Sequence, residues 1–519
     1  MHTKPDTAGK VYLVGAGPSD PGLLTIKGLQ VLKQAQVVIY DALIGPGIYS
    51  LIPPEAEKIP VGKRAGHHLV TQEEISRLIL DQARKGRIVV RLKGGDPFLF
   101  GRGGEELELL VAHQIPYEIV PGVTSAIAVP AYAGIPVTYR GVSSSVHILT
   151  GHRKQDEPLD IDFEALLRAG GTYVFLMGAA ALHEIAAGFL RVGMPPDMPS
   201  AVIGQGTGAG QVSVTAPLDQ LEQEVRSRDV HTPAVIVIGQ TAAFAQRFDW
   251  RGRLPLSQSR ILVTRPASRS GRLAELLRGL GAEVLEIPAI RTRVRDCEDQ
   301  LRQVLDRIDS YNYMVFTSPA GVEHFFSLLN RMELDIRCIG RVKLAVIGSA
   351  TGDELKKRGL RPELMPDRYN GAQLGRLLGR CVPEGGSVLL LRSAQGNAQL
   401  VSQIPSEKQI GVTDLAIYDT VDTSEAYSVY EGGGLSFGAW FGESRIEMVT
   451  FTSASTVRGF VKMAEGMDYT KIRALCIGRM TADQASAYGM QVYLSEKETV
   501  ESMAEAAVKL HMQLSMDSF

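Results

Sequence analysis

The chain has 519 residues, of which 45% are hydrophobic and 22% charged, and its net charge at pH 7 is −2. This length and composition predict a globular protein of several domains. The small net charge excludes nucleic-acid or membrane binding driven by a bulk basic field, so an anionic ligand would need a local basic site.

The sequence shows no membrane span or secretion signal. No apolar run approaches the roughly 20 residues that a membrane-spanning helix needs, and the first residues, MHTKPDTAGK, are polar. The four cysteines form no C-x-x-C pair, which argues against a disulfide framework or a zinc site. The histidines at 67, 68, 147 and 152 lack acidic or cysteine partners at ligand spacing. We expect a cytoplasmic protein with no metal and no membrane or nucleic-acid partner.

Short apolar runs bounded by glycine or proline recur along the first half and predict buried parallel strands. Helices are expected between them, such as 71–86, where Thr71 and Glu74 fit a capping box. This alternation of strands and helices predicts an α/β fold. The strand-like runs are 11–17, 37–41, 88–95, 146–152, 172–178 and 234–240.

The alternation lapses after Gly239, and a fresh strand pattern starts at 261–266. The polar stretch between them, placed at 246–259, is interpreted as a linker between two halves.

The second half contains an internal sequence repeat, here called the internal echo. VFTSPAGV (315–322) resembles TFTSASTV (450–457), and AVIGSATGDELKKRGL (345–360) resembles LCIGRMTADQASAYGM (475–490). Two related α/β domains explain both matches, with their serine and threonine turns at strand ends, where open α/β sheets bind ligands. Chance similarity of two helix N-caps is the alternative, and two matched blocks in the same order disfavour it.

Two glycine motifs stand in the first half. VYLVGAGPSDPGLLT (11–25) partly fits a dinucleotide fingerprint, but Asp20 occupies the third glycine position. A nicotinamide-dependent oxidoreductase, with Asp41 as its ribose-binding acid, therefore stays an alternative. RLKGGDPFLFGRGGEE (91–106) is more specific, because glycines directly after a strand let the backbone approach a ligand closely.

Together with VPGVTSAIAVPAYAGIPVTYR (120–140), FLMG (175–178) and GTGAGQ (206–211), these motifs resemble uroporphyrinogen III C-methyltransferase, of the tetrapyrrole methylase family. The resemblance runs over about residues 11–245. It implies two α/β subdomains, 11–120 and 121–245, with S-adenosylmethionine between them. It also implies methylation of uroporphyrinogen III to precorrin-2, and a homodimer formed through this half.

The resemblance also implies site roles at matching positions. Asp41 matches the family's proposed proton acceptor and Lys63 its proposed proton donor, which suits a reaction in which a pyrrole carbon must lose a proton. Arg64, Arg102 and Arg140 are candidate ligands of substrate carboxylates. Ser19 departs from the glycine that is usual in the family. The implied cofactor-binding residues are Pro18, Gly94, Gly95, Asp96, Leu99, Thr124, Ser125, Met177 and Gly206.

From about 260 to 510 the chain resembles uroporphyrinogen III synthase, through ILVTRP (261–266), VFTSPAGV, AVIGSAT, LLLRS (389–393) and IYDT (417–420). The resemblance implies two α/β domains with parallel sheets. One comprises 260–290 with 421–510, and the other is inserted at 291–420. The implied reaction closes the linear hydroxymethylbilane with inversion of its last ring.

Tyr418 is the candidate acid of this second reaction. Eight residues at strand ends are candidate substrate ligands, although ordinary helix capping explains any single serine or threonine about equally well. They are Thr264, Arg265, Ser318, Thr351, Arg392, Thr452, Ser453 and Thr481.

The two halves would catalyse consecutive steps, from hydroxymethylbilane to precorrin-2 on the route to sirohaem or cobalamin. The alternative is an oxidoreductase fused to a two-lobed small-molecule binding module.

Overall fold

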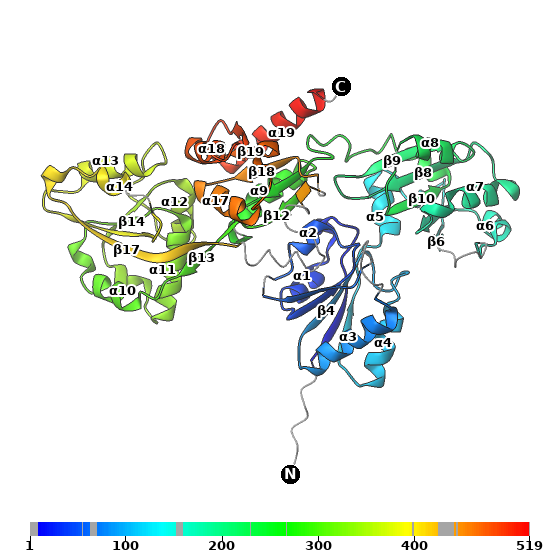
Figure 1. Ribbon diagram of the computed structural model, residues 1–519, viewed down its shortest axis with the longest axis horizontal. Coiled ribbons are helices and arrows are strands. Elements are labelled where there is room, and N and C mark those ends of the chain that lie inside the picture. The colour runs from blue at the N-terminus through cyan, green and yellow to red at the C-terminus, as the bar shows by residue number, and fades with distance from the viewer. Residues whose placement is uncertain are drawn as a thin grey trace, which may run out of the picture. The chain divides into compact units, whose positions relative to one another are not determined.

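The computed structural model describes residues 9–53, 55–62, 70–151, 159–228, 230–265, 267–396, 399–423, 441–442 and 445–517 (Figure 1). The chain divides into two compact units, one of residues 1–289 with 424–519 and the other of residues 290–423. Across these described ranges the strands form four five-stranded sheets. None of the helices found there is both long enough and apolar enough to cross a bilayer.

The first sheet has the order β3-β2-β4-β1-β5 with every pair parallel. Strands β1, β2 and β4 are buried on both faces, which is why they appear in the sequence as continuous apolar runs. The predicted capping box of Thr71 and Glu74 is confirmed at the start of α3. The elements are β1 (Val11–Gly15), α1 (Ile26–Leu32), β2 (Val37–Tyr40), α2 (Pro46–Tyr49), β3 (Glu57–Pro60), α3 (Gln72–Arg84), β4 (Val89–Lys93), α4 (Gly103–Ala112) and β5 (Tyr117–Val120).

The second sheet, of order β6-β7-β10-β8-β9, is mixed. Only β6 and β7 run parallel, whereas β10 is antiparallel to both β7 and β8. The prediction of 234–240 as a parallel strand is therefore wrong, because a continuous apolar run reports burial but not direction. The elements are α5 (Ser125–Tyr132), β6 (Val146–Thr150), α6 (Phe163–Ala169), β7 (Thr172–Leu176), α7 (Leu182–Arg191), β8 (Pro199–Gly204), β9 (Val212–Pro217), α8 (Leu221–Ser227) and β10 (Ala234–Ile238).

The segment interpreted as a linker contains turns but no helix or strand between 246 and 259. It is anchored by side chains, since Trp250 Nε1 donates to the carbonyl of Ala131 at 3.0 Å and Arg251 donates to that of Gly208 at 3.1 Å. The division into subdomains and linker stays a prediction.

The third sheet has the order β12-β11-β18-β19-β20 and is parallel throughout. Its strands come from two stretches far apart in the sequence, before and after residues 290–423. The elements are β11 (Arg260–Val263), α9 (Ala267–Gly279), β12 (Glu283–Glu286), β18 (Met448–Phe451), α17 (Ala454–Met463), β19 (Arg473–Cys476), α18 (Arg479–Ser486), β20 (Gln491–Leu494) and α19 (Val500–Asp517).

The fourth sheet, of order β13-β17-β16-β14-β15, belongs to the unit of residues 290–423. It is parallel except for the edge strand β13, which runs antiparallel to β17. The elements are β13 (Ile290–Val294), α10 (Glu298–Leu305), β14 (Tyr313–Phe316), α11 (Pro319–Arg331), β15 (Lys343–Val346), α12 (Ser349–Lys356), α13 (Gly371–Cys381), β16 (Ser387–Ser393), α14 (Gln399–Ser402) and β17 (Gly411–Asp422).

The internal echo corresponds to a repeated strand–helix–strand–helix unit, β14-α11-β15-α12 and β18-α17-β19-α18. Its helix caps have matching backbone angles. Ser318 has φ −157° and ψ 157°, and Ser453 has φ −166° and ψ 158°. Gly348 and Gly478 differ by only a few degrees, at φ −161° and −162°. The similarity is therefore structural rather than a coincidence of two capping residues.

Candidate functional site

The two glycine motifs of the first half lie against each other at the carboxyl ends of β1 and β4. The amide of Gly17 donates to the carbonyl of Gly95 at 3.1 Å, and the amide of Gly95 donates back to Gly17 at 2.9 Å. Both residues have left-handed φ, +72° and +68°, which favours glycine. Ser19 has φ +90°, so the departure from glycine at this position puts a side chain on strained backbone.

The carboxylate of Asp96 organises the loop that follows β4. Its Oδ1 accepts from the amides of Phe98 at 2.8 Å and Leu99 at 3.1 Å. Its Oδ2 accepts from the amide of Gly122, at 3.0 Å, in the loop after β5. Asp96 therefore joins two loops of the first sheet, and its carboxylate is occupied by backbone donors.

Asp41 follows β2, on the other side of β4, and its carboxylate also accepts hydrogen bonds from backbone amides. Its Oδ1 accepts from the amide of Leu43 at 3.0 Å, and its Oδ2 accepts from the amide of Gly94 at 3.3 Å. The guanidinium of Arg91 lies 4.0 Å from Oδ2. This arrangement orients the carboxylate at the strand ends.

A second wall comes from residues on and beside the second sheet. Thr124 caps α5, accepting from the amide of Ala126 at 3.2 Å, and Ser125 is the first residue of the helix. Met177, directly after β7, is 53% exposed with φ +55°, and such strain clusters at ligand sites. Gly206 leaves no room for a side chain, since a Cβ there would lie 2.4 Å from Val129.

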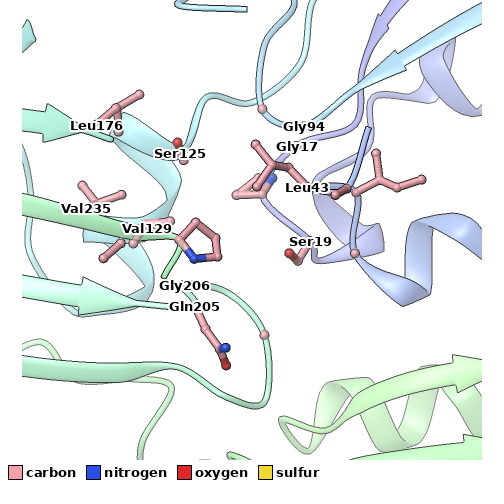
Figure 2. Close-up of a pocket in the computed structure, with 18 of the residues that line it drawn as sticks. Gly17, Ser19, Leu43, Gly94, Ser125, Val129, Leu176, Gln205, Gly206 and Val235 are labelled. Atoms are coloured by element: carbon pink, nitrogen blue, oxygen red, sulfur yellow. The ribbon is translucent and has the colours of Figure 1, made fainter. Parts of the chain in front are cut away.

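These two walls enclose one cleft of about 880 Å³ (Figure 2), within the usual range of small-molecule sites. Every residue predicted to bind the cofactor lines it, as do Asp41 and Arg102. The sequence motifs do not reveal an apolar part of the lining, which includes Leu43, Val129, Leu176, Ile203 and Val235. Ile203 of β8 and Val235 of β10 look like ordinary core residues in the sequence, because burial of a strand does not distinguish the wall of a cleft from the interior.

The predicted substrate ligands of this half are more scattered. Arg102 has φ +55° and binds Glu105 through two hydrogen bonds, of 2.8 and 2.5 Å. Arg140 is exposed, and it is not among the described residues that line the cleft. Lys63 and Arg64 lie outside the described residues, as do three of the four histidines considered for a metal. The remaining one, His147, lies 2.7 Å from the carbonyl of Gly170.

In the unit of residues 290–423, Tyr418 lies on β17 and is only 5% exposed. Its hydroxyl is 2.8 Å from that of Ser318, which also caps α11 by accepting from the amide of Gly321 at 3.1 Å. Arg392, at the end of β16, donates to Asp414 at 2.9 Å. The structure thus brings Ser318 and Tyr418 together, while Arg392 has an acidic partner of its own.

The remaining candidates of this half lie at strand ends or in the first turns of helices. Thr264 is fully buried and donates to the carbonyl of Thr450 at 2.7 Å. Ser453 caps α17, so capping accounts for both Ser453 and Ser318. Thr351 and Thr481 are buried at equivalent positions of α12 and α18. Arg265 and Thr452 follow the neighbouring strands β11 and β18.

Replacing Tyr418 by phenylalanine tests the candidate acid. If this half closes hydroxymethylbilane, as its resemblance implies, we expect the rate of closure to fall about tenfold. This is less than the roughly 100-fold that a general acid often contributes, because the implied substrate is labile and largely preorganised for closure. Loss of the hydrogen bond to Ser318 should cost about 1 kcal/mol of stability. Rates of type III and type I isomer formation, with Ser318→Ala as the matched variant, measure the effect. Full activity in Tyr418→Phe would remove this residue from the mechanism.

Comparison with known proteins gives two family matches. Residues 10–222 match the model described as Tetrapyrrole (Corrin/Porphyrin) Methylases, and residues 271–505 match Uroporphyrinogen-III synthase HemD. The porphyrin biosynthesis protein HemD of Ruminiclostridium josui is 39% identical over 97% of this chain and 98% of its own length.

Two further relatives match the first half. The S-adenosyl-L-methionine-dependent uroporphyrinogen III methyltransferase of Methanosarcina barkeri is 50% identical over 44% of this chain and 91% of its own length. A solved structure of uroporphyrin-III C-methyl transferase from Thermus thermophilus, complexed with S-adenyl homocysteine, is 39% identical with a TM-score of 0.40. It covers 45% of this chain and 99% of that one.

Proposed function

Because the chain belongs to the tetrapyrrole methylase family in its first half and to the uroporphyrinogen-III synthase family in its second, we propose that it catalyses two consecutive reactions. The second half closes hydroxymethylbilane to uroporphyrinogen III, and the first half methylates that product to precorrin-2. The observation that carries the methyltransferase assignment is the single cleft lined by every predicted cofactor residue.

The cleft suits S-adenosylmethionine, which supplies a methyl group when bound. Its apolar lining, including Val129, Leu176 and Val235, offers a slot for an adenine ring. Gly94 and Gly206 line the cleft, and the lack of a side chain at these positions lets a ligand approach the backbone closely. These features hold and orient the reactants, and orientation is the main contribution an enzyme makes to an in-line displacement.

Asp41 has the role of proton acceptor in this proposal. Amides of Leu43 and Gly94 hold its carboxylate at the cleft, which fixes the direction from which a proton can be taken. Lys63 remains the proposed proton donor, and the arginines at 64, 102 and 140 remain proposed carboxylate ligands.

In the second half, the Tyr418 hydroxyl is the proposed acid that assists loss of the terminal hydroxyl of hydroxymethylbilane. Its hydrogen bond with Ser318 fixes the direction of the phenol group. The strand-end candidates of this half remain proposed substrate ligands. Homodimerisation through the first half, cytoplasmic location and a pathway toward sirohaem or cobalamin also stay predictions.

Product analysis of the full chain tests the function. Given hydroxymethylbilane alone, the protein should release the type III isomer of uroporphyrinogen, and with S-adenosylmethionine added it should release a dimethylated product. Mass spectrometry and isomer-resolving chromatography measure both. Formation of the type I isomer alone, as in spontaneous closure, would contradict the synthase assignment. Binding of NAD with no methyl transfer would favour the oxidoreductase alternative.

A further inference from the structure

Strand β4 carries two buried cations directly before the glycine loop. Arg91 and Lys93 are alternate residues of this central strand and therefore point to the same face of the sheet. They are only 3% and 5% exposed. The apolar residues of this face pack against α3 and α4, which lie next to each other in Figure 1. Burying a charge is costly unless it is paired and hydrogen-bonded, so both cations need partners here.

Glu106 of α4 supplies the common partner. This side chain is fully buried, and its Oε1 accepts from Lys93 Nζ at 2.9 Å, Arg91 Nε at 3.1 Å and Gln72 Nε2 at 3.1 Å. Arg91 also donates to the carbonyls of Leu92 at 3.0 Å and Ile39 at 3.3 Å, and it lies 4.0 Å from Asp41. The guanidinium of Arg91 is therefore surrounded by acceptors and is held close to the carboxyl ends of β2 and β4.

Lys93 is less completely satisfied than Arg91. An ammonium group has three N–H donors, and within the described part of the chain Lys93 makes one hydrogen bond, to an oxygen that it shares with two other donors. Burial, and then the charge of Arg91, lower the pKa of Lys93. Lys93 also lines the cleft beside Asp41 and Gly94, so an acceptor that completes its hydrogen bonds can approach from the cleft.

We propose that Lys93 binds a ligand carboxylate in the methyltransferase cleft, and that Glu106 and Arg91 are positioning residues that hold its ammonium group there. This inference rests on the proposed function for the identity of the ligand. A carboxylate is available from two sources, the acidic side chains of the tetrapyrrole and the methionine end of the cofactor. Both would form a charge-assisted hydrogen bond with an ammonium group.

The first test replaces Lys93 by methionine, which keeps an unbranched side chain of nearly the same length and removes its charge. The Arg91–Glu106 pair remains, so one cation and one carboxylate still neutralise each other in the interior. Lys33→Met, an exposed residue at the end of α1, is the matched control. The synthase reaction of the same chain is an internal measure of folding, and both variants should retain it.

Three measurements separate the sources of the carboxylate. They are the KM for uroporphyrinogen III, and the affinities for S-adenosylhomocysteine and for methylthioadenosine, which lacks the carboxylate. If the KM for uroporphyrinogen III rises roughly 10- to 100-fold and both nucleosides bind as before, the carboxylate bound by Lys93 belongs to the tetrapyrrole. If the affinity for S-adenosylhomocysteine falls by the same factor and the affinity for methylthioadenosine is unchanged, the carboxylate belongs to the cofactor. Equal weakening of both nucleosides, or no change in any measurement, overturns the proposal.

The positioning role of Glu106 is tested by combining Glu106→Gln with Lys93→Met. If Glu106 acts through Lys93, the single Glu106→Gln variant weakens the same ligand, and the double variant is little worse than Lys93→Met alone. Additive losses would contradict that role. A parent protein that neither binds S-adenosylhomocysteine nor methylates uroporphyrinogen III would instead contradict the proposed function.

Discussion

Replacing Asp96 by alanine is expected to weaken S-adenosylmethionine binding about 100-fold, equivalent to about 3 kcal/mol. The carboxylate accepts three backbone amides, from Phe98, Leu99 and Gly122. Its loss leaves those donors without their acceptor and releases the loop after β4 from the loop after β5. Hydrogen bonds to charged groups contribute roughly 1.5–3 kcal/mol each, and part of that loss is recovered by water. Titration calorimetry with S-adenosylhomocysteine measures the effect.

Asp162→Ala is the matched control for this prediction. Asp162 also accepts a backbone amide, that of Ala165 at 2.9 Å, but it caps α6 and does not line the cleft formed by the described residues. Its replacement should reduce helix stability without changing cofactor affinity. Unaltered affinity in Asp96→Ala would show that the two loops keep their geometry without the carboxylate, and the role proposed for Asp96 would then be abandoned.

Gly122→Ala is expected to reduce methyltransferase activity about 100-fold, the size of effect that a 1 Å misplacement of reacting groups can produce. A Cβ at this position would lie 2.3 Å from the carbonyl oxygen of Gly95 and 2.6 Å from Gly15 Cα. Both neighbours are backbone atoms, so the glycine loops must separate. Overpacking of this kind costs roughly 1–3 kcal/mol of stability. Steady-state kinetics and thermal unfolding measure the two effects.

Gly104→Ala is the control, because a Cβ there would meet no atom within 4 Å. Gly104 lies in α4, where alanine is favoured over glycine by about 1 kcal/mol, so stability should rise slightly with activity retained. The synthase rate should be normal in both variants. If Gly122→Ala were as active as Gly104→Ala, the close approach of the glycine loops would not matter for the reaction.

Some site residues were predictable because their motifs are local. The glycines of RLKGGDPFLFGRGGEE, with Asp41 and Met177 at matching positions, identify the family, and the structure brings them to one cleft. The internal echo was likewise visible, because each repeat is a continuous strand, turn and helix with its own cap.

Other features depend on contacts between distant segments. Strand β10 is buried on both faces, so its sequence carries no alternation that could indicate an antiparallel neighbour. Val129 and Val235 line the cleft although their apolar side chains look like core residues. In the sequence, Lys93 is simply the last residue of a buried strand before the glycine motif. Only the packing of α4 against β4 brings Glu106 within hydrogen-bond distance of it.

The sequence by itself therefore determined the two families and the loops that form the methyltransferase cleft. Motifs and burial patterns are properties of short segments, and such segments keep them wherever they fold. Only the tertiary structure decided which carboxylates are occupied by backbone amides, which serines act as helix caps and which buried cation borders the cleft. Those properties depend on distances between residues far apart in the chain, and periodicity contains no information about such distances.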